Sequence, residues 1–252
     1  MPTIDALWSN PSLFALLILA AFLVGLSKGG LPAVAMLSVP ILSLHMSPMV
    51  AAVLLLPIYI LSDTVSVWLY RREFSLVNIK VLIPAGILGV IIGWATASYV
   101  SDRMVAVLIG VMGICFCLYT WFKKQASATP KLANPLKGLF WGTFSGFTSF
   151  VSHAGAPPFQ VYVLPQKLPK MVFAGTTTIV FAAINMAKIV PYSMLHPYTY
   201  TTLEVSAYLL PVAAVGTVVG KTLIENLSEK WFFLAVQIAL FIISIRLVAS
   251  AL

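Results

Sequence analysis

The most constraining feature of this sequence is a series of six long apolar segments, each nearly free of charged residues. A helix needs about 20 apolar residues to cross the hydrocarbon core of a bilayer, and each segment is close to that length. Only 9% of the residues are charged and 60% are hydrophobic, whereas roughly a quarter of a soluble domain is charged. We therefore expect an all-α polytopic membrane protein. The segments cover residues 48–70, 76–100, 104–122, 171–195, 203–223 and 231–251.

Two breaks that contain glycine and proline interrupt the remaining apolar runs. The first break covers Lys28–Pro32 and the second covers His153–Pro158. The run that follows each break is too short to span a bilayer, which predicts half-helices of re-entrant hairpins. Irregular backbone at membrane depth must face protein or a water-filled cavity. We therefore expect the two breaks to face each other inside the protein.

The order of the runs recurs on either side of a basic linker. Repeat one covers residues 12–122, the linker 123–137 and repeat two 138–252, all within a single transmembrane domain, 1–252. Each repeat predicts a broken or re-entrant hairpin followed by three transmembrane helices, the duplicated plan of many secondary transporters. The glycines in the third pair of matching motifs also predict close helix packing. The matching motifs are residues 29–32 with 154–157, 47–52 with 169–174, 84–93 with 211–220 and 101–103 with 228–230.

The positive charges fall mostly between the apolar runs, where they act as topology signals. The net charge is +8, but no basic stretch is interleaved with stacking aromatic residues, so no nucleic-acid partner is expected. If the repeats are inverted, the positive-inside rule places the basic turns in the cytoplasm and both termini outside a bacterial inner (plasma) membrane. Arg103 and Arg246 depart from this pattern, and parallel repeats stay an alternative. The basic turns contain Arg71, Arg72, Lys123, Lys124, Lys131, Lys137, Lys167, Lys170 and Lys230.

The sequence offers no constellation for catalysis or metal binding. It has no HExxH, paired acidic or serine-nucleophile motif, and Ser152-His153 lacks a carboxylate partner. Cys115 and Cys117 are poorly placed on one helix for a disulfide, and they have no CxxC partner. We expect no enzyme activity, no catalytic residue, no metal and no cofactor. Because no Lys or Arg precedes Lys28, a cleaved signal peptide is not expected either.

The first break has the composition of an anion site. An unpaired lysine near the membrane centre costs about 2.5–3.5 kcal/mol, so Lys28 needs a partner or a function. Gly29 and Gly30 let backbone amides approach a ligand closely. The half-helix that follows points its positive end at the same place. The alternative is that Lys28 lies in a surface loop and only orients the chain.

The second break carries a histidine in the equivalent place. His153 follows Ser152 and precedes Gly155, and we expect all three to take part in substrate binding. An imidazole here could donate hydrogen bonds to an oxyanion or carry a proton near neutral pH. A purely structural histidine is the alternative.

Polar residues also interrupt the apolar helices. Asp63 and Asn185 occupy equivalent positions in the two repeats, and Asp63 could neutralise Lys28 or relay a coupled proton. Lys188 lies three residues after Asn185 on the same helix face, so it could contact the anion or Asp63. A closed Asp–Lys pair that joins two helices is the alternative. Thr177 offers a hydroxyl to a substrate, or bonds back to its own helix.

Taken in order, the motifs resemble those of the TauE/SafE family of sulfite exporters. They are the glycine-containing end of the first run, Gly25–Gly30, the basic turn Tyr70–Arg72 and the helix motif Pro84–Gly89. The likeness covers nearly the whole chain. The second break departs from the family pattern, because His153–Pro157 has one glycine where several are common.

The resemblance implies export or uptake of sulfite, an organosulfonate or a related sulfur oxyanion, and a carboxylate would suit the same pair of cationic breaks. We expect a secondary transporter whose halves rock to give alternating access, with an anion bound by Lys28, His153, Asn185 and Lys188. Its partners would be a small anionic substrate, a proton as candidate coupling ion, and lipid. An anion channel and a non-transporting membrane partner or assembly protein are the alternatives. The direction of transport and the oligomeric state are left open.

Overall fold

The computed structural model describes residues 10–29, 31–97, 99, 101–122, 130–226 and 229–251. Every regular element in these ranges is a helix, which confirms the all-α prediction. In chain order the α-helices and 3₁₀-helices (η) are α2 (Pro11–Lys28), η1 (Pro32–Leu37), α3 (Ser38–Leu42), α4 (Pro48–Tyr70), α5 (Leu76–Ala97), α6 (Asp102–Phe122), α7 (Pro135–Ser152), α8 (Ala156–Val163), η2 (Leu164–Gln166), α9 (Lys170–Leu195), α10 (Tyr200–Asn226) and α11 (Glu229–Ala251).

Helices α2 and α7 begin with the same local chemistry. Each has an asparagine at the N-cap and a proline in its first turn. The Asn10 side chain accepts from the backbone N–H of Leu13 at 3.2 Å, and the Asn134 side chain accepts from that of Lys137 at 3.0 Å. An N-cap asparagine satisfies an orphan amide, and proline has none to leave unpaired. Both helices have 18 residues, and each ends at one of the predicted breaks.

A short helical segment follows each break. After the first break, η1 has 6 residues and α3 has 5. After the second, α8 has 8 residues and η2 has 3. Either segment is far shorter than the roughly 20 residues that span a bilayer. Short helices are therefore present beside both breaks, as the sequence predicts.

Six helices in the described ranges are long and apolar enough to cross a membrane, namely α2, α4, α5, α6, α9 and α10. Five of them correspond to predicted long segments, while α2 was expected to be one arm of a hairpin. The predicted segment at 231–251 lies in α11, of which Gln237–Ala251 is apolar but shorter. The chain is therefore a multi-pass membrane protein.

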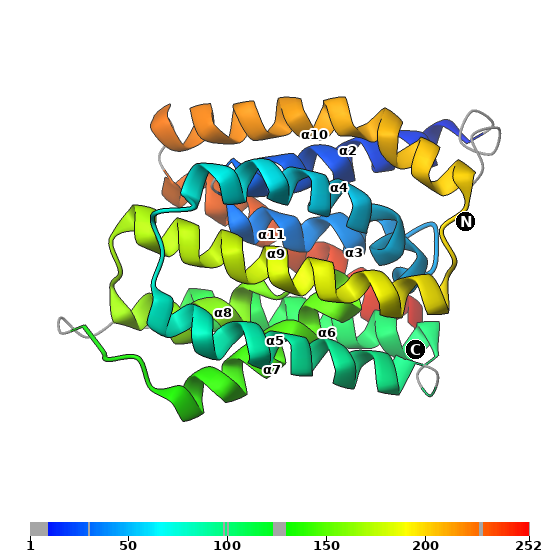
Figure 1. Ribbon diagram of the computed structural model, residues 1–252. Coiled ribbons are helices and arrows are strands. Elements are labelled where there is room, and N and C mark those ends of the chain that lie inside the picture. The colour runs from blue at the N-terminus through cyan, green and yellow to red at the C-terminus, as the bar shows by residue number, and fades with distance from the viewer. Residues whose placement is uncertain are drawn as a thin grey trace.

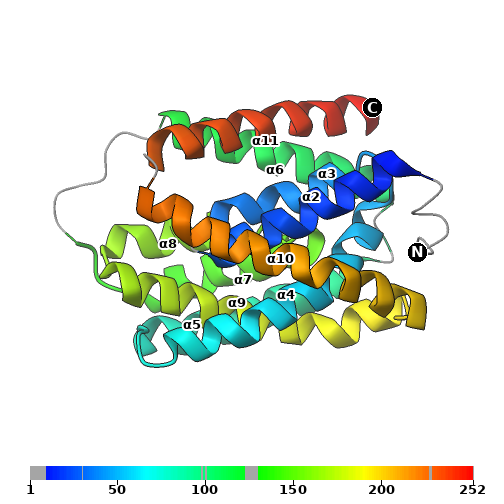
Figure 2. The ribbon, with the colours of Figure 1, turned by 90° about the horizontal axis from the view of Figure 1, so that it is seen from above.

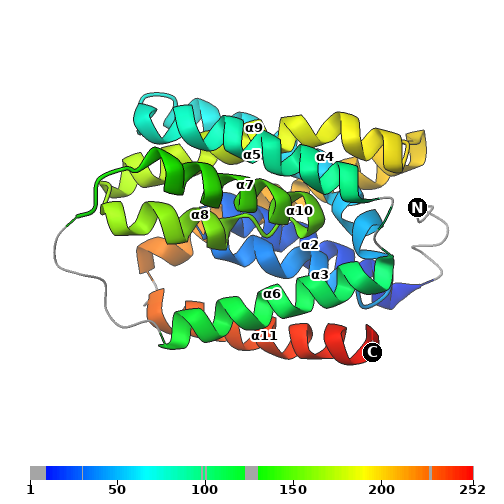
Figure 3. The ribbon, with the colours of Figure 1, turned by 90° about the horizontal axis from the view of Figure 1, so that it is seen from below.

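The helices lie side by side in a bundle, and equivalent helices of the two halves run in opposite directions (Figure 1). The start of α2, the end of α11 and the turn between α9 and α10 lie at one end of the bundle, while the turn after α4 lies at the other. The helix pair α6 and α11 forms one edge, and α4, α5 and α9 lie towards the opposite edge (Figures 2 and 3). These directions are those expected of inverted repeats; the duplication itself stays a prediction.

Glycines bring helices of different halves into backbone contact. In the α5–α7 pair, a Cβ added at Gly146 would overlap the carbonyl of Gly86. In the α2–α10 pair, a Cβ at Gly25 would overlap the carbonyl of Ala213. Small residues allow such close approach in membranes, where van der Waals packing replaces the hydrophobic effect between helices. The two halves therefore contact each other closely through two helix pairs, α5–α7 and α2–α10.

Candidate functional site

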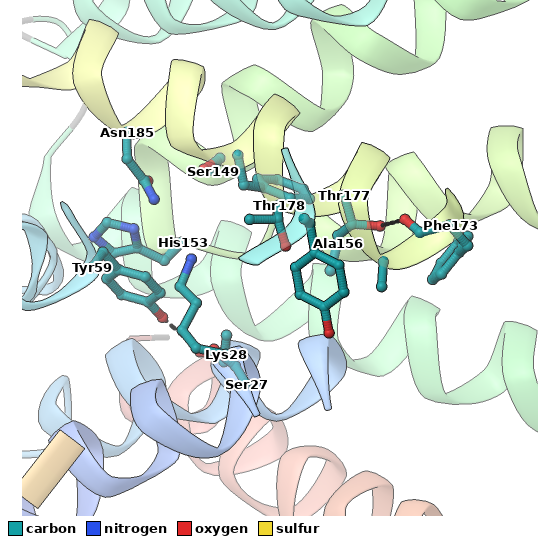
Figure 4. A pocket seen from close by; sticks show the side chains of 14 residues that line it. Ser27, Lys28, Tyr59, Ser149, His153, Ala156, Phe173, Thr177, Thr178 and Asn185 are labelled. Carbon is teal, nitrogen blue, oxygen red and sulfur yellow. Dashed lines mark hydrogen bonds between the residues drawn. The ribbon is translucent and has the colours of Figure 1, made fainter. Parts of the chain in front are cut away.

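A half-enclosed cavity lies between the two breaks, with a volume of about 110 Å³. A cavity needs only about 10–15 Å³ by the same measure to hold one water, so this one has room for a small polyatomic anion. Lys28, Tyr59 and His153 lie close together in it, and Phe173 lies at the far end (Figure 4). The other lining residues are Ser27, Ala35, Tyr70, Ser149, Ala156, Ala174, Thr177, Thr178, Phe181 and Asn185.

Asp63 on α4 joins two of the predicted site residues. Lys28, the last residue of α2, forms an ion pair with its Oδ1 atom. Asn185 on α9 donates from Nδ2 to its Oδ2 atom at 2.6 Å. The Asp63 side chain is 5% exposed and that of Lys28 is 11% exposed. The structure therefore brings Lys28, Asp63 and Asn185 together at the cavity, and Asp63 neutralises Lys28 as one of the sequence-based alternatives has it.

Lys188 forms a second buried cluster behind the cavity wall. Its Nζ donates to the carbonyl and to Oγ of Ser149, each at 3.1 Å, and lies 2.8 Å from Nδ1 of His153. These three acceptors match the three protons of an ammonium group. Lys188 has no exposed surface, and it does not line the cavity. Its contacts therefore differ from the expected ones with the anion or Asp63.

His153 links this cluster to α4. Its Nε2 lies 2.9 Å from the carbonyl oxygen of Ala52. A carbonyl only accepts, so Nε2 carries the proton and Nδ1 accepts from Lys188, which defines a neutral imidazole. The ring stacks on Tyr59 with centroids 4.3 Å apart. Both nitrogens are thus engaged, unlike the free donor or proton carrier that the sequence suggested.

The backbone of His153 also marks this break. Its φ is 54°, a left-handed conformation that costs a residue other than glycine about 1–2 kcal/mol. The residue ends α7, and its N–H donates to the carbonyl of Ser149 at 2.9 Å. A glycine would fit here without strain, whereas the imidazole adds contacts with Ala52, Lys188 and Tyr59.

The predicted glycines have different roles in the two breaks. Gly29 is the C-cap of α2, and Gly30 lies outside the described residues. The carbonyl of Gly155 accepts from Oγ of Ser145 at 2.7 Å, which braces the second break against α7. Neither Gly29 nor Gly155 lines the cavity.

The two predicted hydroxyl residues both bond within their own helices. Thr177 lines the cavity, but its Oγ1 donates to the carbonyl of Phe173 at 2.7 Å. Ser152 is fully buried, and its Oγ lies 3.5 Å from the carbonyl of Thr148. Back-bonding of this kind is the alternative that the sequence left open for Thr177.

Ten of the lining residues were not predicted, and among these Tyr59 and Ser149 contact predicted site residues. Tyr59 lies one helical turn before Asp63, and the i, i+4 spacing could have indicated that they share a face. Its ring centroid is 5.4 Å from Nζ of Lys28, within cation–π range. Ser149 lies four residues before His153, but a serine in a helix carries no distinctive signal. Because its Oγ accepts from Lys188, the Ser149 hydroxyl proton is left for a ligand in the cavity.

The charged side chains around the cavity do not cancel. Counted as ammonium groups, Lys28 and Lys188 contribute two positive charges, Asp63 contributes one negative charge, and His153 is neutral. The sum over these described residues is one net positive charge. A buried charge without a counter-ion is costly, and an anion in the cavity would compensate it.

The fold and the site thus define a multi-pass helical membrane protein with a cavity between two helix breaks and two lysines beside it. The sequence matches the family described as Sulfite exporter TauE/SafE over residues 17–247, nearly the whole chain. The chain belongs to the TauE/SafE family, whose members are membrane transporters of the sulfite-exporter type. No curated protein and no solved structure matches the chain.

Proposed function

We propose that the protein is a secondary transporter that carries a small anion across the bacterial inner membrane by alternating access. The proposed substrate is sulfite, an organosulfonate or a related sulfur oxyanion, in keeping with membership of the sulfite-exporter family. The observation that carries this proposal is that two lysines and a single carboxylate lie beside the cavity between the two breaks. The substrate supplies the missing negative charge, and its escape to the other side is the transport step.

Three side chains contact the anion directly in this proposal. The Lys28 ammonium has three protons, and Asp63 takes one of them, so two can bind an oxyanion. The Ser149 hydroxyl and the Asn185 amide also line the cavity. Lys188 and His153 act through Ser149, because Lys188 polarises the hydroxyl and His153 fixes Lys188. Thr177 and Ser27 form part of the surrounding wall.

Asp63 couples transport to a proton. Its protonation would raise the charge of the cluster by one unit and weaken its hold on Lys28. A divalent anion would then enter together with one proton, and the loaded cavity would carry the same total charge as with a monovalent anion. His153 is the second candidate for this role, but both of its ring nitrogens already have partners.

Uptake into proteoliposomes tests the function. We would screen sulfite, sulfate, thiosulfate, sulfoacetate and simple carboxylates against purified wild-type protein. Saturable uptake of a sulfur oxyanion is expected, with at least about a tenfold loss in Lys28→Ala, because removing a charge-assisted contact costs more than about 1.4 kcal/mol. Lys80→Ala is the matched control, since Lys80 is exposed on α5.

Two outcomes would contradict the proposal. Equal uptake by Lys28→Ala and Lys80→Ala would show that Lys28 is not part of the binding site. Conductance that rises linearly with anion concentration would indicate a channel instead of a carrier.

A further inference from the structure

A proline interrupts the backbone hydrogen bonds of α4. Pro57 lies inside α4 and has no N–H, so the carbonyl of Val53, four residues earlier, loses its helical donor. The Oη atom of Tyr198 donates to this carbonyl at 3.3 Å. Tyr198 belongs to the turn between α9 and α10, so a side chain of the second half supplies the donor that the proline removes.

The neighbouring carbonyls of α4 receive similar bonds. Nε2 of His153 donates to Ala52, as described above. Oγ of Ser206 on α10 lies 3.2 Å from the carbonyl of Leu54 and 3.0 Å from that of Thr202, so these two acceptors share its single proton. Three consecutive carbonyls of α4 thus accept from three separate places in the second half.

These bonds lie on the side of the cavity away from the basic turns. Ala52, Val53 and Leu54 have no exposed surface. The cavity extends the other way, to Tyr70 and Phe173 near the ends of α4 and α9 that face the turn after α4. The end near Tyr198 is therefore the closed one, and the positive-inside rule makes it the external end.

Tyr198 remains a donor throughout the physiological pH range. Burial raises the pKa of its hydroxyl above the ordinary value of 10.0. The phenol therefore stays protonated at neutral and mildly alkaline pH, and the bond to Val53 persists.

We propose that His153, Tyr198 and Ser206 form an outer latch on the α4 carbonyls, and that the latch must release before the cavity can open outward. Tyr198 is a positioning residue, because it acts on transport through α4 and touches no substrate. His153 connects the latch to the cavity, because it bonds to Ala52 and also lines the cavity. The latch proposal depends on the proposed function in one respect, namely that the protein adopts an outward-facing state.

Labelling of a cysteine in the cavity from each side of the membrane tests the latch without any transport assay. Thr178→Cys would be introduced with Cys115→Ser and Cys117→Ser, and exposed to a membrane-impermeant maleimide in intact cells and in inside-out vesicles. Tyr198→Phe should increase labelling in cells by about 2- to 10-fold, the range for one net hydrogen bond. Tyr200→Phe is the control, because Tyr200 is exposed two residues away, and it should change nothing.

A second variant tests the role of the proline. Pro57→Ala restores an N–H that can pair with the Val53 carbonyl, so Tyr198→Phe should have a smaller effect in that background. Equal labelling in Tyr198→Phe and Tyr200→Phe, at whatever level, would overturn the latch. An undiminished effect with Pro57→Ala would show that the hydroxyl acts elsewhere. Failed anion uptake together with the expected labelling would count against the proposed function alone.

Discussion

Asp63 determines how much positive charge the cavity presents to a ligand. One carboxylate oxygen pairs with Lys28 and the other accepts from Asn185, so helices from both halves meet at one side chain. Among the described acidic residues, Asp63 is the one whose charge enters the sum around the cavity. Its protonation is therefore the simplest means of linking anion transport to a proton gradient.

Asp63→Asn should separate the two roles of this carboxylate. The amide keeps the shape and an acceptor for Lys28 but can take up no proton. We expect the pH-gradient stimulation of uptake to disappear, while the affinity for the anion increases by about tenfold, since one negative charge near the ligand is removed. Uptake into proteoliposomes with and without an imposed pH gradient gives both values, and a retained stimulation would assign coupling to another group.

The sequence revealed those site residues whose chemistry is conspicuous in an apolar chain. Lys28, Asp63 and Asn185 stand out because charged and amide side chains are costly in lipid. Ser149 and Tyr59 could not be recognised in this way, because hydroxyl and aromatic residues are ordinary within membrane helices. The indirect role of Lys188 depends on its partners across the α7–α9 contact, which spacing along one helix cannot show.

At the level of elements, glycine spacing predicted close packing but not its partners. Gly89 and Gly93 of α5 pack on α7, and Gly216 and Gly220 of α10 pack on α2. The small-xxx-small pattern marks a face on one helix, while the partner is fixed by the whole bundle. The breaks and the short helices could be predicted, because their length and composition can be read from a short stretch of sequence.

Gly146→Ala tests this backbone contact. A methyl group at this position would overlap the Gly86 carbonyl, so α5 and α7 must separate, with an expected loss of about 1–3 kcal/mol of stability. Thermal unfolding in detergent should show a lower Tm than for wild type. Ala249→Val adds bulk at an exposed position of α11 and should leave Tm nearly unchanged. Equal Tm values for both variants would mean that the contact tolerates the methyl group.

On the scale of the whole molecule, the close helix contacts determine which groups of helices can move relative to one another. The sequence suggested that the two halves rock against each other as separate units. The glycine contacts instead join α2 with α10 and α5 with α7, each pair drawn from both halves. Movement between these cross-half pairs would alter the cavity while leaving the tightest contacts intact.

The central claim is that one anion binds in the cavity through contact with Lys28 and through the charge of Lys188, which lies behind Ser149. The most direct test is the Kd of the transported anion for wild type, Lys28→Met and Lys188→Met, measured by calorimetry on purified protein. A unit charge at roughly 6 Å and an effective dielectric constant of about 20 is worth about 3 kcal/mol. We therefore predict that each variant weakens binding by about tenfold to a hundredfold. Unchanged affinity in both variants would contradict the account.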